Sequence, residues 1–357
     1  MPKDALELPE LEATVERFRS LLDADAIDAA QDHSPAAVYT PFVTVCLMVH
    51  QRLRGNASLE EAVVLWKQQC AGVPAHTRRR LSANSGAYSR ARTRLDLELA
   101  ENVADHVFQT LVSAAPPSCA GRRVFLVDGT TFSLASEDAL RAIYPPASNQ
   151  HGQSVWPILH AAVAHELSSG CAVLPEIGAM YGPDAVSEVT LATRLLLRLP
   201  ARSILLADRA FGIFAFAFAA RQAGHDVITR LTQSRFGALK RRAELVGPGR
   251  WELDWTPTKA DRASHPDLPA DASLRVQLSE AEGTDAQGQP AKLWFMTTLR
   301  ATDLTGSEVA DIYRQRLHVE TDIRDVKVAL KMNELRGRSD PMLRKELALG
   351  MVAYNLV

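Results

Sequence analysis

Four polar residues near the C-terminal end of the chain could lie on one face of a helix: Tyr313, Arg316, Glu320 and Lys327. At 100° per residue they fall inside an arc of roughly 60°. A carboxylate flanked by cations and a phenol is the chemistry expected where a metal ion meets a phosphate backbone. The alternative is a solvated helix face held by ion pairs between residues three and four apart. The choice depends on which other acids the fold brings to this helix.

A separate apolar stripe on the same helix indicates how it packs. The stripe is centred roughly 75° from the polar residues and consists of Ile312, Val319, Ile323, Val326 and Leu330. The helix is therefore predicted to bury one face in a core and to carry the polar residues beside it.

Two further acids close apolar runs that are typical of buried strands. The runs cover residues 123–128 and 203–208 and end in Asp128 and Asp208. Each aspartate alone is more often a turn or helix-cap residue. Strands are also predicted at 156–163, 171–177 and 227–231, with helices at 186–199 and 211–223.

The order of these elements is β-β-β-α-β-α-β. In a doubly wound sheet of this order the first and fourth strands are commonly neighbours, and ligands gather at their carboxyl ends. We therefore expect Asp128 and Asp208 to lie together, with Glu320 supplied by the helix packed against that edge.

Three clustered carboxylates repel one another unless a cation neutralises them. Hard oxygen ligands favour Mg²⁺ or Mn²⁺. Two such ions, roughly 3.5–4 Å apart, can activate a water or a sugar hydroxyl and stabilise the leaving oxygen in phosphoryl transfer. The three acids therefore predict a two-ion site.

Changes in composition and hydrophobic pattern divide the chain into four parts. Residues 1–117 read as a helical domain that ends at a Pro-Pro linker, and 118–232 as the first part of a catalytic core. Residues 233–300 read as a β-rich insertion with strands at 274–278 and 293–299. Residues 301–357 carry the polar helix and the start of a C-terminal helical region.

Composition excludes several classes of protein. Apolar content is 46% and net charge is −2, as in an ordinary globular protein. The four cysteines show no paired spacing, which fits a reducing cytoplasm. The start of the chain lacks a signal peptide's apolar region, and the apolar run 42–49 is too short to span a membrane. No phosphate-binding Gly-rich loop is present, so nucleotide-driven chemistry is not expected.

These motifs resemble a DDE transposase of the insertion-sequence-four type. The family signature is Tyr, two residues, Arg, three residues, Glu, six residues, Lys, and Tyr313 through Lys327 match it in full. Val127-Asp128-Gly129-Thr130 matches the first acid motif, and 208–211 matches the second, with Ala210 where Gly is also common. The resemblance implies a ribonuclease-H-like mixed α/β sheet flanked by helices, with an N-terminal helical domain and a β-rich insertion.

The resemblance also implies a function. Such proteins pair the inverted ends of a mobile element, cut them by hydrolysis and join the freed 3′-hydroxyl to target DNA, working as a homodimer. Asp128, Asp208 and Glu320 would hold two Mg²⁺ or Mn²⁺ ions. The residues that would contact DNA are Tyr313, Arg316, Lys327 and Arg209.

Some positions keep two interpretations open. Trp294 lies where some members stack a flipped base, and it could equally be buried in the insertion's small core. Leu317 stands where some relatives have an aromatic residue, which puts a second stacking contact in doubt. The basic runs at 77–80 and 88–94 are either solvated surfaces or phosphate contacts.

The C-terminal sequence suggests an alternative. Residues 350–357 form an apolar helical pattern without a stop signal, whereas relatives usually continue with further helices. A truncated, non-catalytic DNA-binding protein that competes with a full-length transposase is therefore an alternative. A hydrolase of the same core that only nicks DNA or RNA is another.

Overall fold

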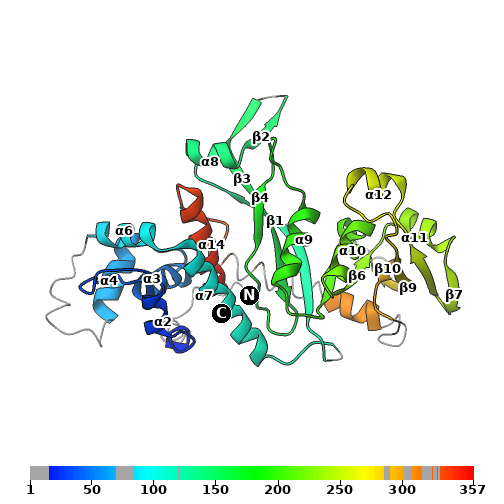
Figure 1. The fold of residues 1–357 in the computed structure, drawn as a ribbon, viewed down its shortest axis with the longest axis horizontal. Helices are drawn as coiled ribbons and strands as arrows, with labels where there is room; N and C mark the ends of the chain where they lie inside the picture. The colour runs from blue at the N-terminus through cyan, green and yellow to red at the C-terminus, as the bar shows by residue number, and fades with distance from the viewer. Residues whose placement is uncertain are drawn as a thin grey trace.

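The computed structural model describes residues 16–69, 84–119, 121–150, 152–284, 290–300 and 330–357, together with 305, 308–315, 324 and 328. Figure 1 shows helices at one end, a sheet in the middle, and further strands and helices at the other end. The C-terminal helix α14 (Asp340–Asn355) lies between the N-terminal helices and the sheet.

The N-terminal part consists of helices, and side-chain caps fix the starts of α2, α3 and α4. Thr40 accepts a hydrogen bond from the Val43 N–H ahead of α3, and the predicted capping box of Ser58 and Glu61 is confirmed. The helix α14 packs against α3 and α7. Among the described residues, no helix combines the length and apolar character that a membrane crossing requires. The N-terminal helices are α2 (Ala24–Ala29), α3 (Pro41–Leu53), α4 (Leu59–Gln69), α6 (Gly86–Arg94) and α7 (Leu97–Ala114).

A buried histidine on α3 should make the fold sensitive to acid. Burial, with the charges of Arg54 and Arg19, lowers the pKa of His50 to about 4. Between pH 6.5 and 4 the unfolded chain binds a proton at His50 that the folded chain does not, so the free energy of unfolding falls as pH falls. We expect His50→Leu to reduce this acid-induced loss by up to about 3 kcal/mol, as measured by urea unfolding across that range.

A matched control is His33→Leu, because His33 is exposed. It should leave the pH dependence unchanged. Equal pH dependence in the His50 variant and the unchanged chain would show that His50 does not titrate in this way.

A ten-stranded mixed sheet forms the centre of the molecule. Its order is β2-β3-β1-β5-β6-β10-β9-β8-β7, with β4 beside β3. The pairs β1–β5 and β5–β6 are parallel and the others are antiparallel. The predicted ribonuclease-H-like mixed sheet flanked by helices is confirmed. The strands are β1 (Val124–Ser133), β2 (Pro146–Asn149), β3 (Gly152–Glu166), β4 (Glu176–Ala179), β5 (Ile204–Ala207), β6 (Asp226–Arg230), β7 (Glu244–Gly247), β8 (Arg250–Trp255), β9 (Leu274–Thr284) and β10 (Pro290–Thr297).

The two faces of the sheet bury different clusters of side chains. Leu126 and Ile204 pack on one face with residues of the N-terminal helices and α14. Phe125 and Leu205 pack on the other face with Leu191 of α9. Strand alternation therefore sorts the apolar residues of β1 and β5 into two cores. The helices between the strands are α8 (Asp138–Ile143), α9 (Glu188–Leu195), α10 (Phe214–Gln222), α11 (Gln233–Lys240) and α12 (Lys259–Ser264), with 3-10 helices η1 (Leu196–Arg198) and η2 (Arg209–Phe211).

The strands predicted at 274–278 and 293–299 are present as β9 and β10, paired antiparallel. Strand β10 also pairs antiparallel with β6, through Phe295↔Arg230 and Thr297↔Ile228. The β-rich segment therefore extends the central sheet by hydrogen bonding. Strands β7 and β8 were not predicted.

The strand predicted at 171–177 was wrong in position. Strand β4 begins only at Glu176, and Ala172 makes a single bridge to His165. Asn355 of α14 takes the place of a neighbouring strand there: its Oδ1 accepts from the Ala172 N–H at 2.7 Å, and its Nδ2 donates to the Ala172 carbonyl at 2.9 Å. The apolar run is buried under α14 without forming a strand, and an apolar run alone does not distinguish the two.

Candidate functional site

The register of β1 against β5 places two of the three predicted acids side by side. The parallel pairing ends at Val127↔Ala207, so the next residues along the two strands are Asp128 and Asp208. Neighbouring strands lie roughly 4.8 Å apart. The predicted pairing of the first and fourth strands is confirmed, and it brings both aspartates to the carboxyl end of β5.

Asp208 is fixed by the turn that follows β5. Its Oδ1 accepts a hydrogen bond from the Ala210 N–H at 2.7 Å, which caps η2. Thr229 Oγ1 on β6 donates to the Asp208 carbonyl at 2.7 Å. Within the described part of the chain, Asp208 Oδ2 has no hydrogen-bond partner, and the neighbouring Arg209 is exposed. Asp208 is thus a helix cap with one carboxylate oxygen left for another ligand.

Asp128 does not end its strand, and this detail of the prediction was wrong. Strand β1 continues to Ser133, and Asp128 pairs with Val163 on β3. Residues 130–132 are two β-branched threonines and a phenylalanine, which favour extended backbone. Strand β5 ends at Ala207, whereas β3 stays paired with β1 as far as Ser133. Asp128 is therefore the first residue of β1 that has no neighbour on the β5 side.

Asp128 points to the face of the sheet that helical residues 308–315 cover. Alternate strand residues face the same way, so Asp128 shares a face with Leu126. Leu126 belongs to the same buried cluster as Tyr313, whose ring packs edge-on against Phe295 with centroids 5.1 Å apart. The start of the polar helix is therefore on the side of the sheet to which Asp128 points.

The remaining residues of the polar helix lie outside the described residues: Arg316, Glu320 and Lys327. Their convergence on the two aspartates stays a prediction. Tyr313 is only 9% exposed, so most of its ring lies in the core together with Ile312.

A carboxylate that the sequence did not single out lies at the same edge. Glu188 begins α9, after the N-cap Ser187, and accepts a hydrogen bond from the Gly129 N–H. Burial raises the pKa of the Glu188 carboxyl, and the charges of Asp208 and Asp128 raise it further. Acids are common in the first turn of a helix because they interact favourably with its dipole, so Glu188 alone does not indicate a site. The glycine directly after Asp128 is the one sequence feature that relates to this contact.

Gly129 leaves room for this carboxylate. A Cβ built on Gly129 would lie 2.0 Å from Glu188 Oε1. We expect Gly129→Ala to force Glu188 out of place and to lower the free energy of unfolding by about 1–3 kcal/mol, as measured by urea denaturation.

The double variant Gly129→Ala/Glu188→Ala tests the cause. Without the glutamate the alanine has no side chain to displace, so its cost should largely disappear, giving a coupling of about 0.5–3 kcal/mol. Additive effects would mean that the alanine acts on the backbone of β1 instead.

Trp294 lies in β10 and is half-buried. It packs against Phe236 of α11, with ring centroids 6.3 Å apart, at the margin of the cluster between the sheet and α11. Part of the Trp294 side chain is therefore buried in this cluster, as one of its two interpretations predicts, and the rest is exposed. Nearby Trp251 packs against the same Phe236 and lies under Lys240 Nζ.

The donor chemistry at the edge fits a hard divalent cation, because Asp128 and Asp208 offer carboxylate oxygens. Over the residues that the structure describes, no group of three or more His, Cys, Asp or Glu side chains could hold a metal ion. Glu188 approaches from the α9 face, opposite to Asp128, and is tied to Gly129. The predicted third ligand, Glu320, lies outside the described residues.

A family model described as a transposase DDE domain matches residues 120–356, which is more than half of the chain and includes Asp128 and Asp208. No curated protein matches the chain.

Proposed function

Because the chain belongs to the transposase DDE domain family, we propose that it cuts the ends of a mobile DNA element by metal-dependent hydrolysis and joins the freed 3′-hydroxyl to target DNA. The observation that carries this proposal is the pair Asp128 and Asp208, which one sheet register brings together inside the matched region. Transposases of this family bind DNA and generally use divalent metal ions.

The three acids Asp128, Asp208 and Glu320 are proposed as the ligands of two Mg²⁺ or Mn²⁺ ions. When bound, such ions activate the attacking oxygen and stabilise the leaving oxygen. The Ala210 N–H holds Asp208 Oδ1 and leaves Oδ2 directed elsewhere. A carboxylate that is already oriented needs little reorganisation to bind a cation.

The proposed DNA contacts surround these acids. Arg209 is exposed directly after Asp208, where its guanidinium can bind a phosphate next to the scissile one. Tyr313, Arg316 and Lys327 are proposed to hold further phosphates, and Trp294 a flipped base.

The N-terminal helices are proposed to bind the element ends. A basic pocket of about 700 Å³ lies between these helices, α14 and the segment that leads into α14. On α6, Arg92 is turned inward to Glu346, while Arg90 and Arg94 are exposed. The cations that line the pocket are Arg52, Arg92, Arg336, Arg338 and Lys345.

Three finer assignments accompany this proposal. The spacing from Tyr313 to Lys327 favours the insertion-sequence-four type. Residues 1–117, 118–232, 233–300 and 301–357 are proposed as end-binding, core, insertion and final core segments. A homodimer is proposed on DNA, because two element ends must be paired.

The test is a cleavage assay with labelled duplex that carries the element's terminal repeat, in Mg²⁺, Mn²⁺ or EDTA. Metal-dependent cutting at the repeat boundary is expected. A pre-cut end should also yield a joined product, which a nicking hydrolase would not form. Binding without cutting or joining would instead favour the non-catalytic competitor.

A further inference from the structure

A further charged site lies at the opposite end of β5 and β6 from Asp128 and Asp208. It is a pocket of about 410 Å³ at the starts of β5 and β6. Asp208, after β5, lies five positions along the chain from Ser203, before it, which corresponds to roughly 16 Å along a strand. The pocket is therefore distinct from the proposed catalytic edge. It is lined by Arg122, Arg202, Arg221, Gly224, Asp226, Thr298 and Arg300.

The charges of this pocket do not balance. Without counting Arg300, three arginines face one aspartate, which leaves a formal excess of two positive charges. The neighbouring His225 adds none, because its Nδ1 accepts from the Ser203 N–H and burial lowers its pKa. Within the described part of the chain, no other acid lines the pocket. Like charges held this close repel one another, and an anion would relieve the repulsion.

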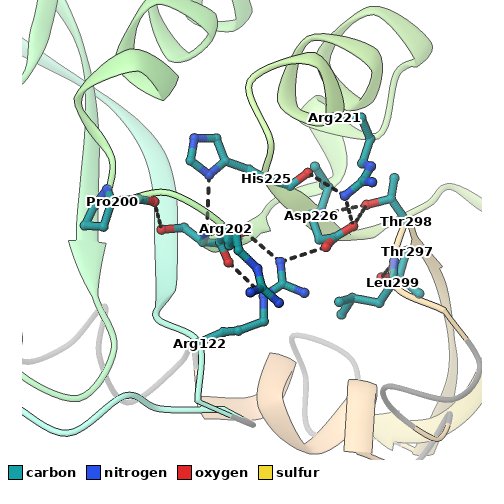
Figure 2. Close-up of polar contacts among 11 residues, drawn as sticks. Arg122, Pro200, Arg202, Arg221, His225, Asp226, Thr297, Thr298 and Leu299 are labelled. Atoms are coloured by element: carbon teal, nitrogen blue, oxygen red, sulfur yellow. Dashed lines mark hydrogen bonds and ion pairs between the residues drawn. The ribbon is translucent and has the colours of Figure 1, made fainter.

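Two guanidinium groups are held in fixed orientations. Figure 2 shows Arg122 and Arg221 meeting Asp226 from two sides, each at 2.7 Å. Arg122 also donates to the Arg202 carbonyl at 2.7 Å, and Thr298 Oγ1 donates to Asp226 at 2.8 Å. These contacts use Nε and Nη2 of Arg122 and Nη1 of Arg221. Among the described contacts, Arg122 Nη1 and Arg221 Nη2 remain as donors.

A third arginine is placed at a conformational cost. Arg202 has φ +61°, in the left-handed region that favours glycine, and its side chain is exposed. A glycine at position 202 could accept the Arg122 hydrogen bond through its carbonyl equally well. The side chain is therefore the feature that distinguishes this position, and it brings another planar guanidinium to the pocket.

We propose that this pocket binds a phosphate group, held by the guanidinium donors that Asp226 orients. Forked guanidinium donors match phosphate oxygens in geometry and charge. The phosphate could belong to a DNA backbone or to free phosphate. The proposal goes beyond the proposed transposase activity and does not depend on it.

The test uses Arg202→Gly in the full chain. This change removes one guanidinium and relaxes the left-handed backbone, so the variant should fold and its melting temperature should not fall. Lys331→Gly is the matched control, because Lys331 is also an exposed cation with positive φ (+47°), and it does not line this pocket.

The first readout is the rise in melting temperature with inorganic phosphate, compared with chloride at equal ionic strength. The unchanged chain and the Lys331 variant should bind phosphate equally. The Arg202 variant should bind about tenfold more weakly or worse, since it loses charge-assisted hydrogen bonds. Equal phosphate binding by all three proteins would overturn the proposal.

The second readout identifies the source of the phosphate. Affinity for a short duplex of arbitrary sequence would be measured against salt concentration. If a backbone phosphate occupies the pocket, the slope of log affinity against log salt should fall by about 0.9 in the Arg202 variant. Weaker phosphate binding with an unchanged slope would assign the pocket to free phosphate.

Discussion

An Asp208→Asn variant should cut element-end DNA about 10³-fold more slowly than the unchanged chain. Loss of a carboxylate ligand removes several kcal/mol of charge stabilisation in the transition state, and each 1.4 kcal/mol is about tenfold in rate. Asparagine keeps an oxygen that can accept from the Ala210 N–H. The melting temperature and the affinity for DNA ends should therefore change little. The measurement is a single-turnover cleavage assay in Mg²⁺, beside thermal unfolding and a DNA-binding titration.

Asp23→Asn is the matched control, because Asp23 also caps a helix, accepting from the Ala26 N–H at 3.0 Å, and is remote in sequence from the acids. Its activity should be unchanged. If Asp208→Asn retained activity within about tenfold, the assignment of Asp208 as a metal ligand would be wrong. Equal losses in both variants would point to altered folding instead.

The position of the two aspartates could be predicted from the sequence because it depends on strand order alone. In a doubly wound sheet of the predicted order, the first and fourth strands are expected to be parallel neighbours, and the residues at their carboxyl ends then meet. The continuation of β1 beyond Asp128 was not predictable in the same way. It depends on the long antiparallel partner β3, which reaches Ile158 opposite Ser133.

The contributions of distant segments were the least predictable. Glu188 lies against Gly129 only because α9 packs on the sheet with Gly129 beneath its first turn. Asn355 completes the backbone hydrogen bonds of Ala172 from the far end of the chain. Neither contact has a local pattern, since each joins residues that sequence spacing does not relate. Local patterns therefore predicted many of the elements and the strand order that brings the two aspartates together, and not the side chains that support them.

The largest stability loss is expected at Glu346, which joins α14 to the N-terminal helices. Glu346 is 9% exposed. Its Oε1 pairs with Arg92 of α6, and its Oε2 accepts from the N–H groups of Arg336 and Gly337 at 2.8 and 3.0 Å. One carboxylate on α14 thus pairs with a half-buried guanidinium on α6 and accepts from two backbone N–H groups in the segment before α14.

We expect Glu346→Ala to lower the free energy of unfolding by roughly 3–5 kcal/mol, because it leaves a charge and two N–H groups without partners. The melting temperature should fall by roughly 5–10 °C. Glu346→Gln should cost less, since its amide oxygen can still accept from the loop. Glu334→Ala is the control: Glu334 is exposed and meets Arg336 only at 3.9 Å, so its loss should cost at most about 1 kcal/mol. Similar losses for Glu346→Ala and Glu334→Ala would mean that α14 is held by its apolar contacts with α3 and α7 and not by this carboxylate.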